Sequence, residues 1–219
     1  MLKTLIIETF RGKTLPRILM NLAIKDYTAK NPVKGQTIDL GSKSNGMSYN
    51  RFLSKEADCK ITYTDMEASA KDIVKLNLEE KFKTESGSYD SVMCFNTMEH
   101  IFNFKNIAEE SYRILKKDGI FIGSTPFLIC YHADPDDYFR YTHSALERIF
   151  KDAGFEKIKM QSLGIGHFST GLYQVVMGIP KVIRPLGLMF VILMDKIFHL
   201  LSKASKDQYA LSYFFVFKK

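Results

Sequence analysis

Short apolar runs alternate with amphipathic segments along most of the chain. The apolar runs predict strands near residues 37–41, 60–65, 73–77, 90–96, 119–125, 155–161 and 210–217. The amphipathic segments predict helices near residues 14–30, 46–55, 66–71, 103–116 and 143–153. Because such alternation builds a mostly parallel sheet with helices on both faces, the pattern predicts an α/β fold with seven strands.

A long interval, residues 161–208, separates the last two predicted strands and exceeds a simple hairpin connection. Its glycine-rich first part predicts a loop, whereas residues 184–203 can form a helix. The apolar side of that helix would carry Leu188, Val191, Ile192, Met194 and Leu201. The basic residues around it are Lys181, Arg184, Lys196, Lys203 and Lys206. Such a helix can lie on an anionic membrane or cover a lipid-linked acceptor, but it can also pack on the sheet or on a second subunit of a homodimer.

The length of 219 residues favours one domain with appended parts. We expect an N-terminal helical cap at residues 1–34, a core at 35–160, a helical appendix at 161–208 and a final strand at 209–219. The apolar run at 186–194 is too short to cross a bilayer, and the first residues lack the features of a signal peptide.

The charge distribution indicates which binding partners to expect, and the cysteine content indicates the cellular compartment. Residues 1–35 and 181–219 each carry seven Lys or Arg against two acids, whereas the whole chain is only +7. Basic ends on a near-neutral centre favour an anionic surface over nucleic acid, although solubilising charge explains them as well. The three cysteines lack metal or disulfide spacing, which predicts a cytoplasmic protein, either free or peripheral on the inner face of the membrane.

The chemistry-bearing residues begin where the first predicted strand ends. That strand runs into Asp39-Leu40-Gly41-Ser42, the turn continues to Gly46, and the next strand ends in Asp65. A turn of small residues lets backbone N–H groups approach a ligand, and an acid at the tip of the second strand can hold a ribose diol. The pattern therefore predicts a site for an adenosine-containing cofactor.

Two further stretches extend this pattern into a family resemblance. These stretches are "YDSVMCFNTMEHI" at 89–101 and "RILKKDGIFIGSTP" at 113–126. Together with the turn, they make roughly residues 35–160 resemble class I S-adenosylmethionine-dependent methyltransferases. The segments "DPDDYFRYT" at 134–142 and "YFFVFKK" at 213–219 are similar to a bacterial subgroup associated with surface-polysaccharide biosynthesis. The resemblance implies a Rossmann-like sheet with a helical insertion before its last strand, S-adenosylmethionine as cofactor, and a saccharide or lipid-linked acceptor.

The resemblance also implies which residues hold the cofactor. They are Asp39, Gly41, Ser42, Gly46, Asp65, Met66, Asn77, Leu78 and Asn96. Asp65 would accept the ribose hydroxyls and Asn96 would lie near the sulfonium. Lys43 and Asn45 stand where the family has glycine. Asparagine tolerates a left-handed backbone, but a lysine cation beside the sulfonium would weaken binding unless it points outward, so a non-catalytic binding protein stays open as an alternative.

A nicotinamide-dependent dehydrogenase is the competing interpretation of an acid after a glycine turn. Gly41 and Gly46 lack between them the middle glycine that admits a pyrophosphate, and no hydride-transfer constellation accompanies them. The sequence therefore favours the methyltransferase.

Candidate acceptor-side residues follow the fifth predicted strand. His132, Asp136 and Arg140 would lie over the methyl group, and a neutral imidazole suits proton removal from a hydroxyl. The same segment could be structural, with Thr142 capping the next helix and Arg140 pairing with a carboxylate to hold the loop.

His100, directly after Glu99, is the other candidate base. In related quinone-biosynthesis O-methyltransferases a similar Glu-x-x-Glu-His carries a metal, but here Asn96 stands where the first Glu would be. We therefore expect no metal, and we expect Glu99 and His100 to brace the corner between strand and helix. A quinone or small-lipid methyltransferase stays open as an alternative.

Overall fold

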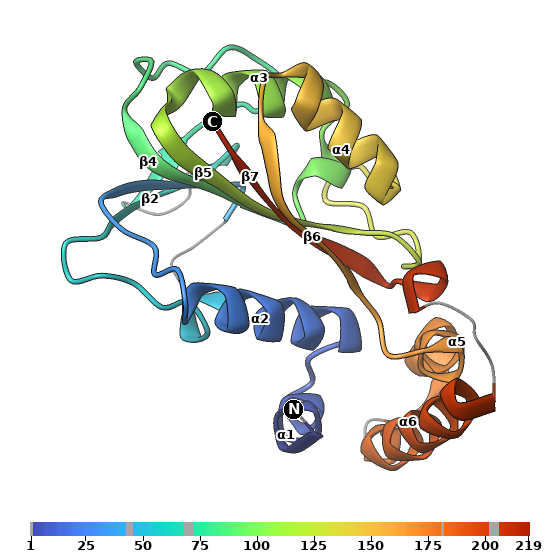
Figure 1. The fold of residues 1–219 in the computed structure, drawn as a ribbon. Coiled ribbons are helices and arrows are strands. Elements are labelled where there is room, and N and C mark those ends of the chain that lie inside the picture. The colour runs from blue at the N-terminus through green and yellow to red at the C-terminus, as the bar shows by residue number, and fades with distance from the viewer. Residues whose placement is uncertain (1, 43–45, 68–71, 181, 202–205) are drawn as a thin grey trace.

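A seven-stranded sheet forms the centre of the computed structural model, which describes residues 2–42, 46–67, 72–180, 182–201 and 206–219 (Figure 1). The strands are β1 (Gln36–Leu40), β2 (Lys60–Asp65), β3 (Ile73–Lys75), β4 (Tyr89–Phe95), β5 (Leu115–Pro126), β6 (Glu156–Leu163) and β7 (Ser212–Lys218). Their order is β3-β2-β1-β4-β5-β7-β6, and β7 runs antiparallel to both of its neighbours. The predicted Rossmann-like, mostly parallel sheet is thus confirmed.

Helices cover both faces of the sheet and enclose two hydrophobic cores. Helix α2 (Leu15–Thr28) lies on one face, and α3 (Phe104–Ile114) and α4 (His143–Asp152) lie on the other (Figure 1). Strand β7 contributes to both cores, because Phe214 faces the side of α2 while Phe215 faces the side of α4. A strand that is buried on both faces reads as a continuous apolar run, as "YFFVF" does.

Several predicted elements differ in extent from the observed ones. The segment expected as a helix at 46–55 forms only a short 3-10 helix, Ser48–Arg51. Strand β5 begins at Leu115, directly after α3, rather than near residue 119. An additional helix, α1 (Leu2–Phe10), precedes α2. Most of the helix predicted at 66–71 lies outside the described residues.

The described part of the appendix is largely helical, and the predicted loop is wrong in one place. Helix α5 (His167–Val175) forms where glycines predicted a loop, because Asp195 of α6 (Arg184–Leu201) caps it. Both carboxylate oxygens of Asp195 accept hydrogen bonds, one from Phe168 N and one from Ser169 N, at 2.8 and 3.0 Å. A cap from a residue 26 positions away leaves no local sequence signal.

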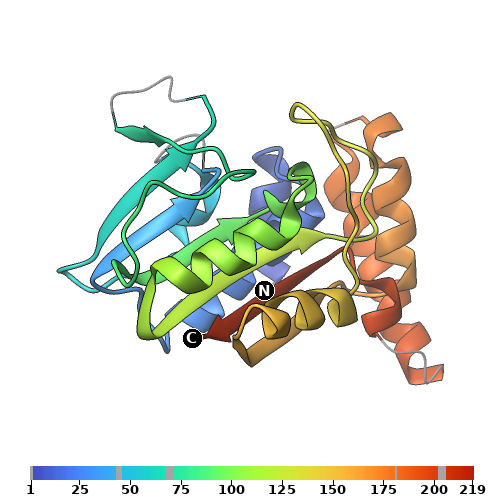
Figure 2. The same cartoon turned by 90° about the horizontal axis from the view of Figure 1, so that it is seen from above.

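Helices α5, α6 and α1 pack together beyond the β6–β7 end of the sheet (Figures 1 and 2). Leu188 and Ile192 of α6 are buried in the core that α2 shares. The helix side for which membrane contact and packing on the protein were both left open thus packs inward at Leu188 and Ile192. The apolar residues that α6 exposes lie at other positions, namely Leu186, Met189, Phe190, Leu193, Ile197 and Leu200. In the described parts of the chain, no helix has the length and apolar character needed to cross a membrane.

Candidate functional site

The carboxyl ends of β1, β2 and β4 bring the turn after Leu40, Asp65 and Asn96 to one edge of the sheet. Gly41 has a φ of +67°, and a side chain there would collide with Thr97, so the turn requires glycine. Ser42 N donates to Thr64 O at 2.9 Å, which fixes the start of the turn against β2. Lys43 and Asn45, the two departures from glycine, lie outside the described residues.

Asp39 is the buried acid at the end of β1. Its Oδ2 accepts a hydrogen bond of 2.6 Å from Tyr49 Oη, and no described group donates to its Oδ1. Burial raises the pKa of Asp39 to about 7, although the Tyr49 hydrogen bond acts in the opposite direction. A buried oxygen without a donor fits the ammonium group of an amino-acid moiety, as the predicted cofactor carries. Tyr49, which supports Asp39, was not singled out by the sequence analysis.

Arg17 of α2 is a second residue that the sequence analysis missed. Its Nη1 is buried, with no hydrogen-bond partner among the residues described. Burial lowers the pKa of Arg17, and the nearby Tyr49 and Glu99 act in the opposite direction. Arg17 precedes every motif in the chain, so only the docking of α2 beside the sheet brings it here. A guanidinium N–H without a partner at this place can meet a carboxylate of a ligand.

The residues predicted to bind the rest of the cofactor differ in their hydrogen bonds and in their burial. Asp65 Oδ1 accepts from Glu67 N at 2.9 Å, and Met66 beside it is 58% exposed, so its side chain is available to a ligand. Asn77 bonds within its own loop, whereas the Leu78 side chain is buried in the core beside α3. The Asn96 backbone is left-handed, with φ of +52°, and its Oδ1 accepts from Ser124 Oγ at 2.9 Å.

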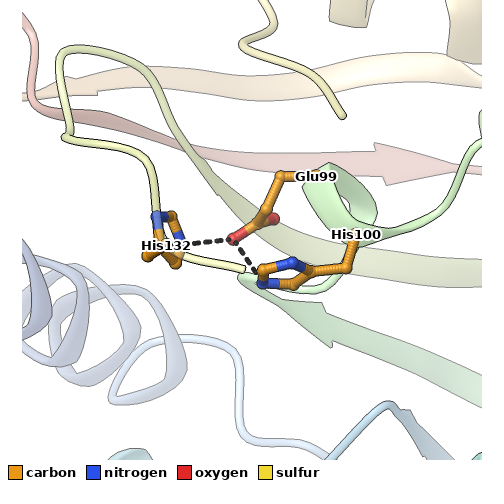
Figure 3. A group of neighbouring side chains, drawn as sticks. All are labelled: Glu99, His100 and His132. Carbon is orange, nitrogen blue, oxygen red and sulfur yellow. Dashed lines mark ion pairs between the residues drawn. The ribbon is translucent and has the colours of Figure 1, made fainter. Parts of the chain in front are cut away.

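Glu99, His100 and His132 form a close group at the same edge of the sheet (Figure 3). Glu99 is fully buried in the 3-10 helix Met98–His100 that follows β4, and His132 comes from the segment after β5. Glu99 Oε1 lies 3.7 Å from His100 Nε2 and 3.6 Å from His132 Nε2. Both separations exceed a hydrogen bond, yet the Glu99 carboxylate still raises the pKa of His132.

The segment after β5 is held in place by a second charged pair. Arg140 donates to both oxygens of Asp137, and His132 N donates to Asp137 Oδ2 at 2.8 Å. The Arg140 guanidinium lowers the pKa of Asp137 to about 2. The Asp136 side chain is exposed and accepts from Tyr138 Oη, while its carbonyl oxygen contacts His100 Nδ1. Arg140 thus has the loop-holding contact that the sequence left as an alternative, and His100 and His132 converge on Glu99.

Comparisons with known proteins bear on the family and the fold of this chain. Residues 9–160 match the family described as "Methyltransferase domain". A SAM-dependent methyltransferase from Archaeoglobus fulgidus is similar in structure, with a TM-score of 0.60, 15% identity and coverage of 97% of both chains. Phosphoethanolamine N-methyltransferase 2 of Haemonchus contortus, solved with S-adenosyl-L-methionine, has a TM-score of 0.56 and 15% identity over 91% of this chain and 52% of that one.

A third similar structure is that of the cyclase SpnF, with a TM-score of 0.55 and 12% identity over 90% of this chain and 80% of that one. At such identities the structural likeness concerns the fold alone, and a cyclase among the neighbours illustrates that the fold does not fix the reaction. No curated protein matches the sequence.

Proposed function

The chain belongs to the methyltransferase-domain family, and from that premise we propose that it transfers a methyl group from S-adenosylmethionine to a hydroxyl of a saccharide or lipid-linked intermediate. The observation that carries the proposal is that two sets of polar residues lie on one edge of the sheet. Asp39 and Asp65 lie at the carboxyl ends of β1 and β2, and the histidine pair around Glu99 follows β4 and β5. This placement supports a cofactor side and an acceptor side that adjoin, as a displacement at carbon requires.

On the cofactor side, four residues would hold S-adenosylmethionine, which supplies an electrophilic methyl group when bound. Asp39 Oδ1 would accept from the ammonium group and Arg17 Nη1 would donate to the carboxylate, so each buried atom gains the partner it lacks among the described residues. Asp65 would accept from the ribose hydroxyls, and Asn96 would lie near the sulfonium.

On the acceptor side, the two imidazoles are the candidate bases. His132 or His100 would take the proton of the attacking hydroxyl, and Glu99 would stabilise the imidazolium that forms. The exposed Asp136 offers a carboxylate to further hydroxyls of a polyol, and Arg140 positions the segment through Asp137. Much of the rate would come from holding the hydroxyl in line with the methyl group.

Titration with S-adenosylmethionine and S-adenosylhomocysteine by calorimetry tests the cofactor first, in wild type and Asp65→Ala. We expect binding in the micromolar range that is lost in the variant, followed by transfer of labelled methyl groups to saccharide acceptors. Absence of binding to folded wild type would favour the non-catalytic alternative. Transfer to quinones or small lipids, but not to saccharides, would refute the acceptor assignment.

We also propose contact between the appendix and an anionic membrane surface on the cytoplasmic side. Leu186 and Phe190 of α6 are 68% and 64% exposed, and Phe10 of α1 is 67% exposed. A cavity of about 70 Å³ between these helices is lined by Phe10 together with the basic Lys13 and Arg184. Apolar side chains beside cations suit anionic lipid better than a neutral protein surface.

Liposome co-sedimentation tests the membrane contact with the double variant Leu186→Asp/Phe190→Asp. Leu188 is unsuitable for this experiment, because it is buried. The matched control is Val74→Asp, which changes an exposed apolar residue on β3. We expect loss of binding to anionic vesicles in the double variant alone. Unchanged binding by the folded variant would refute the contact, as would a variant that instead loses only dimer formation in gel filtration.

A further inference from the structure

We propose that Glu99, His100 and His132 bind a first-row divalent cation, with Zn²⁺ the best match to the ligand set. Each residue offers one ligand atom, and the three atoms lie within 4.8 Å of one another. Two imidazoles and one carboxylate suit zinc or a neighbouring transition metal, whereas Mg²⁺ and Ca²⁺ prefer sets made of oxygen alone.

The separations agree with a cation between the side chains. Glu99 Oε1 lies 3.6 and 3.7 Å from the two Nε2 atoms. Two ligands bound tetrahedrally at roughly 2.0–2.1 Å from zinc stand about 3.4 Å apart, so small shifts would complete the site. For a direct hydrogen bond the same separations are too long.

The opposite ring nitrogens have the contacts that orient metal-bound histidines. His100 Nδ1 contacts Asp136 O, and His132 Nδ1 lies 3.0 Å from Cys130 O. A carbonyl oxygen only accepts, so each Nδ1 carries a proton and each Nε2 is directed toward Glu99, where it can serve as the metal ligand (Figure 3). An Nε2 lone pair that faces a carboxylate requires a positive charge between the two, either a proton or a metal ion, and the test below distinguishes them.

Glu99 supplies an independent observation. Its side chain is fully buried, and neither oxygen has a hydrogen-bond partner in the described part of the chain. Burying a carboxylate without donors is costly, and a cation offsets that cost. Because Glu99 follows β4 beside Asn96, the cation would lie at the acceptor end of the proposed site. There it would lower the pKa of a hydroxyl bound to it, and this role would replace proton removal by His132 or His100, whose Nε2 atoms would be metal ligands.

The test is metal binding by the purified full chain without cofactor or acceptor, so its result does not depend on the proposed methyl transfer. Zn²⁺ and Mg²⁺ are measured by equilibrium dialysis, and Co²⁺ by its visible absorption as a report on coordination. The variants are Glu99→Gln, His100→Asn and His132→Asn. The matched control is His143→Asn, at the exposed first residue of α4.

We expect one equivalent of Zn²⁺ in wild type and in the control, and an affinity at least about 100-fold weaker in each cluster variant, since even outer-shell changes cost 10–100-fold. Glu99 is buried, so Glu99→Gln can disturb folding, and the exposed His132→Asn decides the question. Binding that persists in folded His132→Asn and His100→Asn overturns the proposal. So does wild type that binds only Mg²⁺ or no metal at all, which would leave an imidazolium–carboxylate pair.

Discussion

Replacing Asp39 by asparagine should stabilise the protein without cofactor, and the gain should grow with pH. Asp39 is fully buried, and burial raises its pKa from an ordinary value near 3.8 to about 7. Asparagine has almost the same shape and can still accept from Tyr49 Oη. The variant therefore loses the charge and keeps the supporting hydrogen bond.

The sign and the magnitude follow from linkage between protonation and folding. Between pH 4 and pH 7 the folded state keeps a proton on Asp39 that the unfolded state has released, so wild type loses stability as pH rises. The free energy of unfolding of wild type falls by about 1.4 kcal/mol per pH unit over this range, and the total loss above pH 7 is about 4 kcal/mol. The asparagine side chain of the variant cannot ionise, so the stability difference between variant and wild type should grow by about 3 kcal/mol from pH 5 to pH 8.

Urea unfolding of both proteins at several pH values measures this difference. Asp90→Asn serves as the control, because Lys116 and the Gln36 N–H outweigh burial and lower the pKa of Asp90; its stability difference from wild type should therefore stay constant from pH 5 to pH 8 and change only below about pH 4. A difference between Asp39→Asn and wild type that does not change with pH would refute the reasoning. The stabilised Asp39→Asn variant should also bind S-adenosylmethionine more weakly, since it lacks the carboxylate for the ammonium group.

Three further substitutions test the turn, the appendix and the acceptor segment. Gly41→Ala should lower the free energy of unfolding by at least about 1 kcal/mol and abolish cofactor binding, because the left-handed backbone of Gly41 and the neighbouring Thr97 exclude a side chain. Thermal unfolding measures the first effect and calorimetry the second. Asp195→Ala should cost about 1.5–3 kcal/mol in urea unfolding, because two N–H groups of α5 lose a charged acceptor. Arg140→Lys should leave cofactor affinity unchanged and lower methyl transfer roughly 10- to 100-fold, because lysine cannot contact both oxygens of Asp137. Equal losses of cofactor binding and turnover would contradict a positioning role.

The sequence by itself determined the sheet of this protein and which residues at its edge are candidates for binding a cofactor. Strand periodicity, the buried run in β7 and the Asp39–Gly41 turn are local features, and each predicts its own surroundings. Gly41 is an example, since its positive φ is needed by the turn in which it stands. For this reason the positions of the strands along the chain could be predicted, and candidate cofactor residues named, without the fold.

Tertiary structure alone decided which distant residues meet. Arg17 lies near Glu99 only because α2 docks on the sheet, and His132 reaches Glu99 only because the segment after β5 folds back to the end of β4. Helix α5 likewise depends on Asp195 of another helix. Hydrophobic periodicity predicts which side chains are buried, but it does not predict which segment covers them. The inward side of α6 and the group around Glu99 therefore depend on packing between segments that lie far apart in the chain.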